Sequence, residues 1–118
     1  MAIHNVASAE AMVLGMKAGL EPDSILNVIQ AGAGNSRIFE LRAPMMVKDE
    51  YDKPTMKMDV WQKDMQVIGE FADSLNCQLP LFTRSDAVYK QAMEQGMDKL
   101  DTASVCRVLE QLSAFQRG

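Results

Sequence analysis

The chain has 118 residues, the length of one small domain. Apolar residues make up 47% and charged residues 24% of it, which is the composition of an ordinary soluble globular protein. Its 12 basic and 16 acidic residues give a net charge of −4, so a nucleic-acid partner is not expected. No apolar run reaches the roughly 20 residues of a membrane-spanning helix, and no signal peptide is evident. Two cysteines do not make a disulfide framework, so we expect a cytoplasmic protein.

The periodicity of the apolar residues predicts an all-α fold with about five or six helices. Segments of helical length lie between glycines and prolines, and no segment alternates apolar and polar residues long enough for a strand. We expect residues 1–118 to form a single helical domain. Its expected helices span residues 2–18, 22–31, a third segment after Asn35, 57–75, 81–95, and a sixth segment after Asp101.

The first expected helix is apolar on almost every face, which predicts a central and buried position. Gly19 is expected to end it, with Lys17 at the negative end of the helix dipole. No Ser, Thr, Asp or Asn precedes the apolar pattern to cap the first backbone amides. We interpret this start as the middle of a longer helix, and the chain as the C-terminal part of a longer protein.

The later helices carry more specific signals. Asn35 is the expected N-cap of the third helix, and Pro44 is expected to break that helix, so that residues 45–54 form a short turn and a loop. Asp101 is the expected N-cap of the sixth helix. The fourth helix has the clearest amphipathic pattern, and its expected buried face carries Trp61, Met65, Ile68, Phe71, Ala72 and Leu75.

Few residues are candidates for chemistry. Residues 31–34 contain two glycines but lack the third glycine and the preceding strand of a dinucleotide-binding loop, so they are interpreted as a turn between helices. The only histidine, His4, is interpreted as a core or edge residue, and no metal site is expected. Lys63 either pairs with Asp59 on a solvated helix face or lies at the mouth of a cleft for an anionic ligand. Asp64 lies at the edge of the apolar face, where a carboxylate needs a partner.

The sulfur-containing residues have a structural interpretation. Most of the ten methionines fall at helix positions expected to be buried, which favours core packing over an adaptable binding surface. Cys77 and Cys106 are expected to be buried thiols rather than nucleophiles. Composition and spacing alone therefore predict an all-helical domain without a complete active site.

Several segments follow one another in a distinctive order along the whole chain. They are Ala9-Glu10-Ala11, Met16 to Pro22, Gly34-Asn35-Ser36 with Phe39, Arg42, Pro44 and Met46, then Lys63-Asp64-Met65, Pro80-Leu81, and finally Tyr89, Ala92, Gly96, Asp98 and Asp101 before Ser104-Val105. This ordered set resembles the second domain of the β-hydroxyacid dehydrogenases. Hydroxyisobutyrate dehydrogenase, tartronate semialdehyde reductase and glyoxylate reductase belong to that family, and phosphogluconate dehydrogenase is a more distant member.

The resemblance implies the all-α C-terminal domain of these enzymes, which packs on an N-terminal Rossmann-type domain and forms much of the subunit interface. It therefore implies a homodimer, with hydride transfer between NAD or NADP and a β-hydroxyacid in the cleft between the domains. By position, Lys63 would approach the nicotinamide end of the cofactor and Asp64 would hold the cleft in shape. Ser36 and Met56 are the expected substrate-side residues. Met56 stands seven residues before Lys63, where the family often has phenylalanine.

Two parts of the family pattern are not found in these residues. The family's catalytic lysine and a nearby asparagine lie upstream of the position of Ala2, and Asn5 falls several residues too late to replace that asparagine. The Gly-rich dinucleotide-binding domain is not found either. No catalytic residue is therefore assigned, tight binding of NAD or NADP is not expected, and the chain is expected to be inactive alone.

Two other functions are compatible with the same residues. The chain could be a free-standing helical interaction or oligomerisation module derived from the family, in which uncovered apolar surface binds a partner. It could also be a small-molecule-binding domain that uses a cleft around Lys63, Asp64 and Ser36. The first alternative predicts a native gene product of 13.1 kDa, and the second predicts weak anion binding that depends on Lys63.

Overall fold

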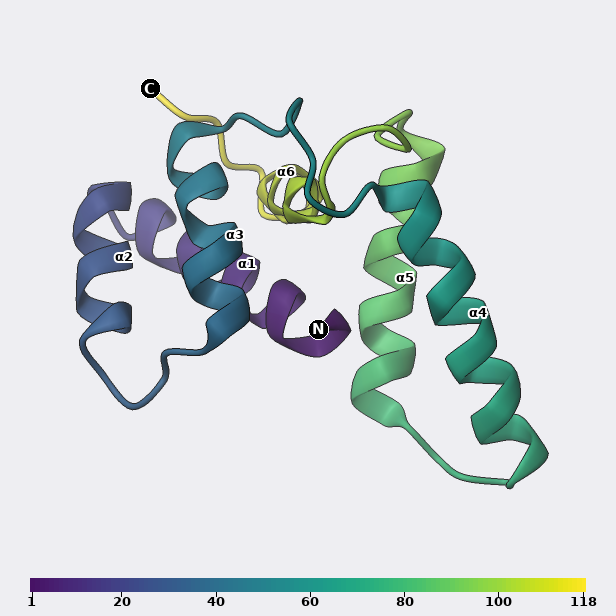
Figure 1. Ribbon diagram of the computed structural model, residues 1–118. Helices are drawn as coiled ribbons and strands as arrows, with labels where there is room; N and C mark the ends of the chain where they lie inside the picture. The colour runs from purple at the N-terminus through teal and green to yellow at the C-terminus, as the bar shows by residue number, and fades with distance from the viewer.

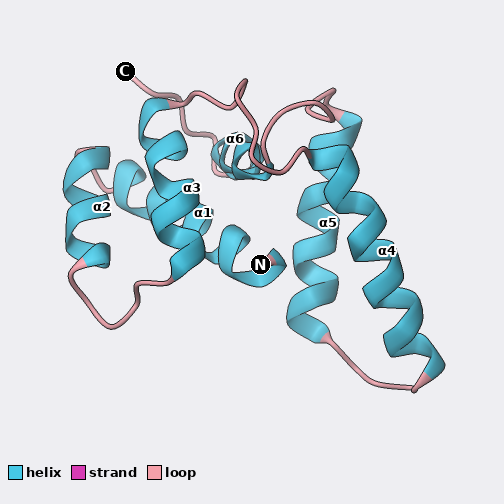
Figure 2. Cartoon of the chain, in the orientation of Figure 1, coloured by secondary structure: helices cyan, strands magenta, loops and turns pink.

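The computed structural model describes residues 1–118 as six α-helices joined by turns and loops (Figure 1). One 3₁₀ turn, η1, precedes the last helix. The elements are α1 (Ala2–Lys17), α2 (Pro22–Gln30), α3 (Arg37–Lys48), α4 (Met58–Ser74), α5 (Pro80–Glu94), η1 (Thr102–Ser104) and α6 (Val105–Leu112). Figure 2 shows only helices and loops, so the predicted all-α fold is confirmed. No helix combines the length and the apolar character needed to span a membrane.

Helix α1 lies at the centre of the molecule, as predicted. It packs against α2, α3, α5 and α6. In Figure 1, α2 and α3 stand on one side of it and the α4–α5 hairpin on the other. One hydrophobic core of 22 buried residues includes its inward side chains. The expectation that α1 is buried on every face is wrong, because its neighbours cover only part of its circumference and leave Ile3, Ala7 and Leu14 exposed.

The end of α1 is the predicted glycine turn. Gly19 has a φ of 95°, a left-handed conformation that glycine adopts without steric cost. Its N–H donates to the Met16 carbonyl, and the Leu20 N–H donates to the Gly15 carbonyl, both at 3.0 Å. This pair of hydrogen bonds is a Schellman motif. At the other end of α1, no side chain caps the first amides.

Two expectations for α3 are wrong. Its N-cap is Ser36, whose Oγ accepts a hydrogen bond from the Phe39 N–H at 3.0 Å, while the Asn35 side chain donates to Glu40. Pro44 does not break the helix, which continues to Lys48. A proline inside a helix removes one backbone hydrogen bond. Here the helix is kept because residues on both sides of Pro44 are fully buried in the core, namely Ala43 and Met46.

Helix α4 packs mainly against α5, so only one side of it is buried. The buried side chains are Met58, Trp61, Met65 and Ala72. Three residues that were expected to be buried are exposed instead: Ile68 (40%), Phe71 (65%) and Leu75 (63%). Together with the exposed Val60 and Val67 they form an apolar surface along α4, which we call the α4 outer strip. The expectation is wrong there because no other helix lies over this side of α4.

The sulfur-containing residues follow the predictions except at one position. Six methionines are buried and the other four are packed against the core, so the predicted core role of methionine is confirmed. Cys106 is buried as expected. Cys77 is exposed, contrary to expectation, because it lies in the turn that follows α4.

Candidate functional site

Asp64 lies within the α4 outer strip, and Lys63 lies at its edge, between Val67 and the polar side chains of Gln66 and Glu70. A rotation of 100° per residue places both on the same side of the helix as Val60, Val67 and Phe71. Both are exposed, and neither forms an ion pair within the chain. The structure thus presents a carboxylate among apolar side chains that face solvent and an ammonium at the edge of the same surface.

Asp59 does not pair with Lys63, although the spacing allows it. Its Oδ2 lies 2.6 Å from Nζ of Lys99, which comes from the loop before η1. This hydrogen bond lowers the pKa of Asp59 and raises the pKa of Lys99. Because the carboxylate of Asp59 is paired with Lys99, the ammonium of Lys63 stays available to a ligand or to a second surface.

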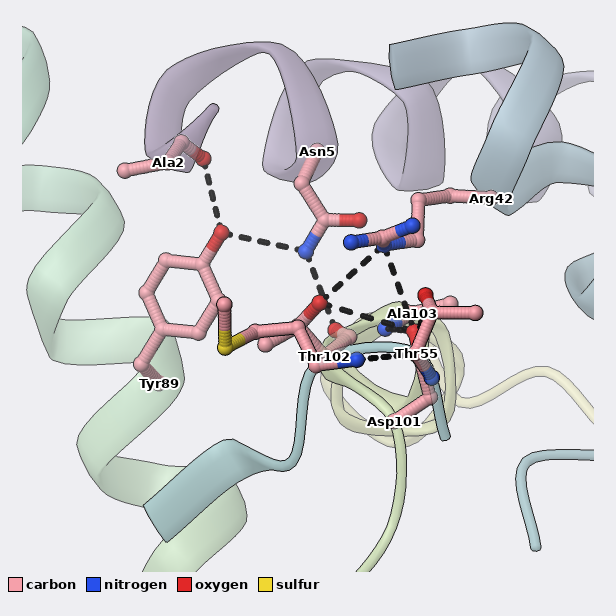
Figure 3. A network of polar contacts seen from close by, with 9 residues as sticks. Ala2, Asn5, Arg42, Thr55, Tyr89, Asp101, Thr102 and Ala103 are labelled. Atoms are coloured by element: carbon pink, nitrogen blue, oxygen red, sulfur yellow. Dashed lines mark hydrogen bonds and ion pairs between the residues drawn. The ribbon is translucent and has the colours of Figure 1, made fainter. Parts of the chain in front are cut away.

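The segment that enters α4 is held by the carboxylate of Asp101 (Figure 3). This side chain is fully buried. Its Oδ2 accepts hydrogen bonds from the backbone N–H groups of Thr55 (2.9 Å) and Met56 (3.2 Å), and its Oδ1 accepts one from the Ala103 N–H (2.8 Å). Nε of Arg42 lies 3.3 Å from Oδ1 and supplies the opposite charge. The carboxylate therefore fixes the start of the helix that carries Lys63.

A second part of the same buried network joins α1 to α5 and η1. The Tyr89 hydroxyl donates to the Ala2 carbonyl at 2.8 Å and accepts from Nδ2 of Asn5 at 3.0 Å. Nδ2 of Asn5 also donates to the Thr102 carbonyl at 3.0 Å, and Nε of Arg42 donates to Oγ1 of Thr102 at 3.2 Å. Burial raises the pKa of Tyr89 to about 12, so its hydroxyl stays protonated at neutral pH.

Sequence reasoning missed these connections. The sequence indicated Arg42 and Asp101 only as parts of the segments that resemble the family, and Asp101 also as a helix cap. The available signal was a polar residue, Asn5, in a helix that is otherwise apolar, because a buried amide requires partners. Asn5 connects α1 to α5 and η1 through these hydrogen bonds, and it does not lie on the α4 outer strip.

The two predicted substrate-side residues lie apart from each other. Met56 is in the segment before α4, and its partly buried side chain packs against the core. Ser36 caps α3 and borders a cavity of about 110 Å³ with His4 and Ser8, which is lined only by α1, α2, α3 and the turn before α3. The structure therefore brings Lys63 and Asp64 together, but it does not join them to Ser36 in that cavity. No group of three or more acidic, His or Cys side chains is placed to hold a metal ion.

Comparison with known proteins identifies relatives of this fold. The profile of a family described as "NAD-binding of NADP-dependent 3-hydroxyisobutyrate dehydrogenase" matches residues 1–109. L-threonate dehydrogenase of Cupriavidus necator is 33% identical over 106 residues, which cover 90% of this chain and 35% of that protein. L-threonate dehydrogenase of Haemophilus influenzae is 32% identical over 116 residues, which cover 98% of this chain and 38% of that protein. The crystal structure of 3-hydroxyisobutyrate dehydrogenase from Salmonella typhimurium superimposes with a TM-score of 0.86 and 32% identity, over 91% of this chain and 37% of that one.

The fold and these similarities define an all-α domain of the dehydrogenase class of oxidoreductases. More narrowly, the chain belongs to the family of NAD-binding C-terminal domains of 3-hydroxyisobutyrate dehydrogenases, within the β-hydroxyacid dehydrogenases. This is the family that the ordered segments of the sequence resemble. The chain spans little more than a third of the length of these relatives, 35% and 38% for the two threonate dehydrogenases.

Proposed function

We propose that the chain is the C-terminal substrate-binding and dimerising domain of an NAD(P)-dependent β-hydroxyacid dehydrogenase. The observation that carries this proposal is the unpaired ammonium of Lys63 at the edge of the α4 outer strip. A contiguous apolar surface of this kind on a small protein marks a place where another surface docks. In this proposal an N-terminal Rossmann-type domain covers it, and the cofactor cleft lies between the two.

The residues of α4 fit one wall of such a cleft. NAD or NADP would supply the hydride acceptor or donor there. Lys63 would attract an anionic group of the cofactor or the carboxylate of a β-hydroxyacid, and its attraction would strengthen as docking excludes water. Asp64, one residue further along the strip, would hold the cleft in shape. Met56 would border the substrate side from the start of α4, whereas Ser36, placed in another cavity, would act as the cap of α3.

The proposal includes inactivity of these 118 residues on their own. They provide only one exposed surface that a dinucleotide could contact. They contain no Gly-rich loop after a strand that could hold its phosphates. A chain that lacks the family's upstream lysine would also lose proton transfer. Incubation of the purified chain with NAD(P)H and a semialdehyde should give no turnover, and measurable turnover would contradict this part of the proposal.

The first test is the mass of the native gene product in its own cells, measured with an antibody or by mass spectrometry. A product well above 13.1 kDa that reduces or oxidises a β-hydroxyacid pair supports the dehydrogenase. In that protein, Lys63→Ala should lower kcat/KM by about 100-fold, because a charge next to the reacting groups is lost. Lys90→Ala is the matched control, since Lys90 is an exposed lysine of α5 that pairs with Asp86. Equal activity of the two variants would refute the role of Lys63.

The same apolar surface also supports a second candidate, a free-standing interaction module derived from the family. In that case the α4 outer strip would bind a partner protein and no cofactor cleft would form. A native product of 13.1 kDa without dehydrogenase activity would favour this function over the first.

A further inference from the structure

The residues that follow α6 run back over the molecule instead of projecting into solvent. We call residues 113–118 the strap, and Figure 1 shows them in yellow as they pass the end of α3. Alternate side chains of the strap are half-buried: Ser113, Phe115 and Arg117. Phe115 packs against the hydrophobic core, and Nζ of Lys17 donates a hydrogen bond to the Ser113 carbonyl. The strap therefore turns one side toward the helices and the other toward solvent.

Arg117 holds the strap in place through three contacts with other parts of the chain. Its Nε lies 2.6 Å from Oε1 of Glu110, a residue of α6 whose side chain is 11% exposed. Its Nη1 donates to the Val47 carbonyl of α3 at 3.1 Å. Its Nη2 lies 3.8 Å from Sγ of Cys106. The guanidinium thus joins α3 to α6, and it lies against a thiol that has no exposed surface.

The Cys106 thiol is unreactive while the strap is closed. Burial, and after it the Glu110 carboxylate, raise the pKa of this thiol to about 11. Thiol–disulfide exchange requires a thiolate and access to it. An opening that moves Arg117 away removes one wall of the enclosure. Contact with water then returns the pKa of the thiol toward its usual value of about 8.5, so the same opening supplies both access and the thiolate.

The backbone of the strap contains a point of strain where it can open. The Ala114 N–H donates to the Gln111 carbonyl at 3.1 Å, and the Phe115 N–H donates to the Glu110 carbonyl at 2.8 Å. This pair is a Schellman motif, which needs a left-handed residue and usually has glycine there. Ala114 adopts that conformation with a φ of 51°, which is unfavourable for a residue with a Cβ atom. The closed strap therefore depends on the contacts of Arg117 to offset the strain at Ala114.

We propose that Cys106 is a gated site of thiol–disulfide exchange, which reacts with small disulfides when Arg117 leaves its three contacts and the strap opens at Ala114. In the open state the Cys106 thiolate attacks one sulfur of the disulfide and forms a mixed disulfide, and the other sulfur leaves as a thiolate. The proton of the thiol passes to solvent. The group added to Sγ takes the place of the guanidinium, so the modified chain keeps its strap open. The strap includes no residue of the α4 outer strip, so this inference does not depend on the proposed function.

The test follows the reaction of the 118-residue chain with the aromatic disulfide DTNB, which releases a coloured thiolate. The background variant Cys77→Ser removes the exposed thiol, so that only Cys106 can react. Division of the observed rate by that of a free model thiol gives the fraction of time for which Cys106 is accessible. We expect this fraction to exceed the unfolded fraction, known from urea unfolding, at least about tenfold, because the core stays folded when the strap opens.

Two changes in the strap should move the rate in opposite directions. Arg117→Gln removes the charge that pairs with Glu110 and should raise the labelling rate of Cys106 at least about tenfold. Ala114→Gly relieves the strain of the closed strap and should lower the rate about threefold. Arg84→Gln is the matched control, since Arg84 is an exposed arginine of α5 without an ion pair, and it should leave the rate unchanged.

Urea separates strap opening from global unfolding. Opening exposes little surface, so the labelling rate should hardly change at urea concentrations below the unfolding transition. If the accessible fraction of Cys106 equals the unfolded fraction in every variant, the thiol reacts only through global unfolding and the proposal is overturned. Equal rates for Arg117→Gln and Arg84→Gln overturn the role of the strap, and a faster rate for Ala114→Gly overturns the role of strain. Circular dichroism verifies that each variant is folded; if Arg117→Gln is not, the background variant and Ala114→Gly decide.

Discussion

Asp101 shows how one residue organises a large part of this molecule. A buried carboxylate is costly unless hydrogen bonds and an opposite charge compensate for lost hydration. Here backbone N–H groups of three residues and the side chain of Arg42 supply that compensation. The sequence predicted Asp101 only as the N-cap of the sixth helix, whereas its Oδ1 caps η1, the 3₁₀ turn before α6. The contacts with Thr55 and Met56 span 46 and 45 residues, and no local pattern indicates a contact at that distance.

Asp101→Asn should be strongly destabilising. The amide keeps the shape of the side chain, but it removes the charge opposite Arg42 and points an N–H₂ group at backbone N–H donors. We expect the free energy of unfolding in urea to fall by about 3–5 kcal/mol, as when one partner of a buried pair is removed. Asp98→Asn is the control, because the Asp98 side chain makes no ion pair, and it should stay within about 0.5 kcal/mol of wild type. A loss below about 1 kcal/mol for Asp101→Asn would show that the pair with Arg42 is not essential.

At the scale of single helices, the sequence predicted where helices occur better than which face is buried. The pattern of α4 contains two apolar stripes, one with Trp61 and Met65 and one with Val67 and Phe71. Periodicity merges them into one wide face, and only the position of α5 decides which stripe is covered. The N-cap of α3 has a similar ambiguity, because both Asn35 and Ser36 carry suitable acceptors.

Pro44 gives a prediction at the same scale. It remains inside α3 although its ring forbids a hydrogen bond to the Glu40 carbonyl. Pro44→Ala should restore that bond and raise the free energy of unfolding by about 1–2 kcal/mol, after the gain in unfolded-chain entropy is subtracted. Thermal unfolding followed by circular dichroism measures the change. Pro54→Ala lies in a loop and should be neutral or slightly destabilising. A destabilised Pro44→Ala chain would mean that packing of the proline ring outweighs the helical hydrogen bond.

At the scale of the whole molecule, the chain is held together by contacts that join its two ends. The hydrogen bonds of Asn5 to Tyr89 and Thr102 connect residues 84 and 97 positions apart. The periodicity of the apolar residues predicted an all-α domain of about five or six helices, and the apolar character of α1 predicted its central place. The surfaces that α1 and α4 leave uncovered were not predicted, because a sequence pattern shows apolar side chains but not which of them lack a neighbour.

The free energy of unfolding at alkaline pH depends on three buried groups of the core that can lose a proton. Burial raises the pKa of Cys106 to about 11 and of Tyr89 to about 12, and it also raises the pKa of Tyr51. Each of these groups is uncharged in the folded state and has a lower pKa when the chain unfolds. Between about pH 9 and 11 the unfolded chain therefore releases protons that the folded chain retains, and stability falls as pH rises.

Since one pKa unit corresponds to about 1.4 kcal/mol, the free energy of unfolding should drop by about 4–5 kcal/mol from pH 9 to pH 11 when the three groups are summed. Urea unfolding at successive pH values measures the slope. In Cys106→Ala the slope between pH 9 and 10 should be reduced, because the cysteine thiol has the lowest pKa of the three groups in the unfolded chain and contributes most of the change in that range. The comparison uses slopes, so a lower baseline stability of the variant does not affect it. An equal slope in both proteins would mean that the Cys106 thiol ionises as easily in the folded core as in water.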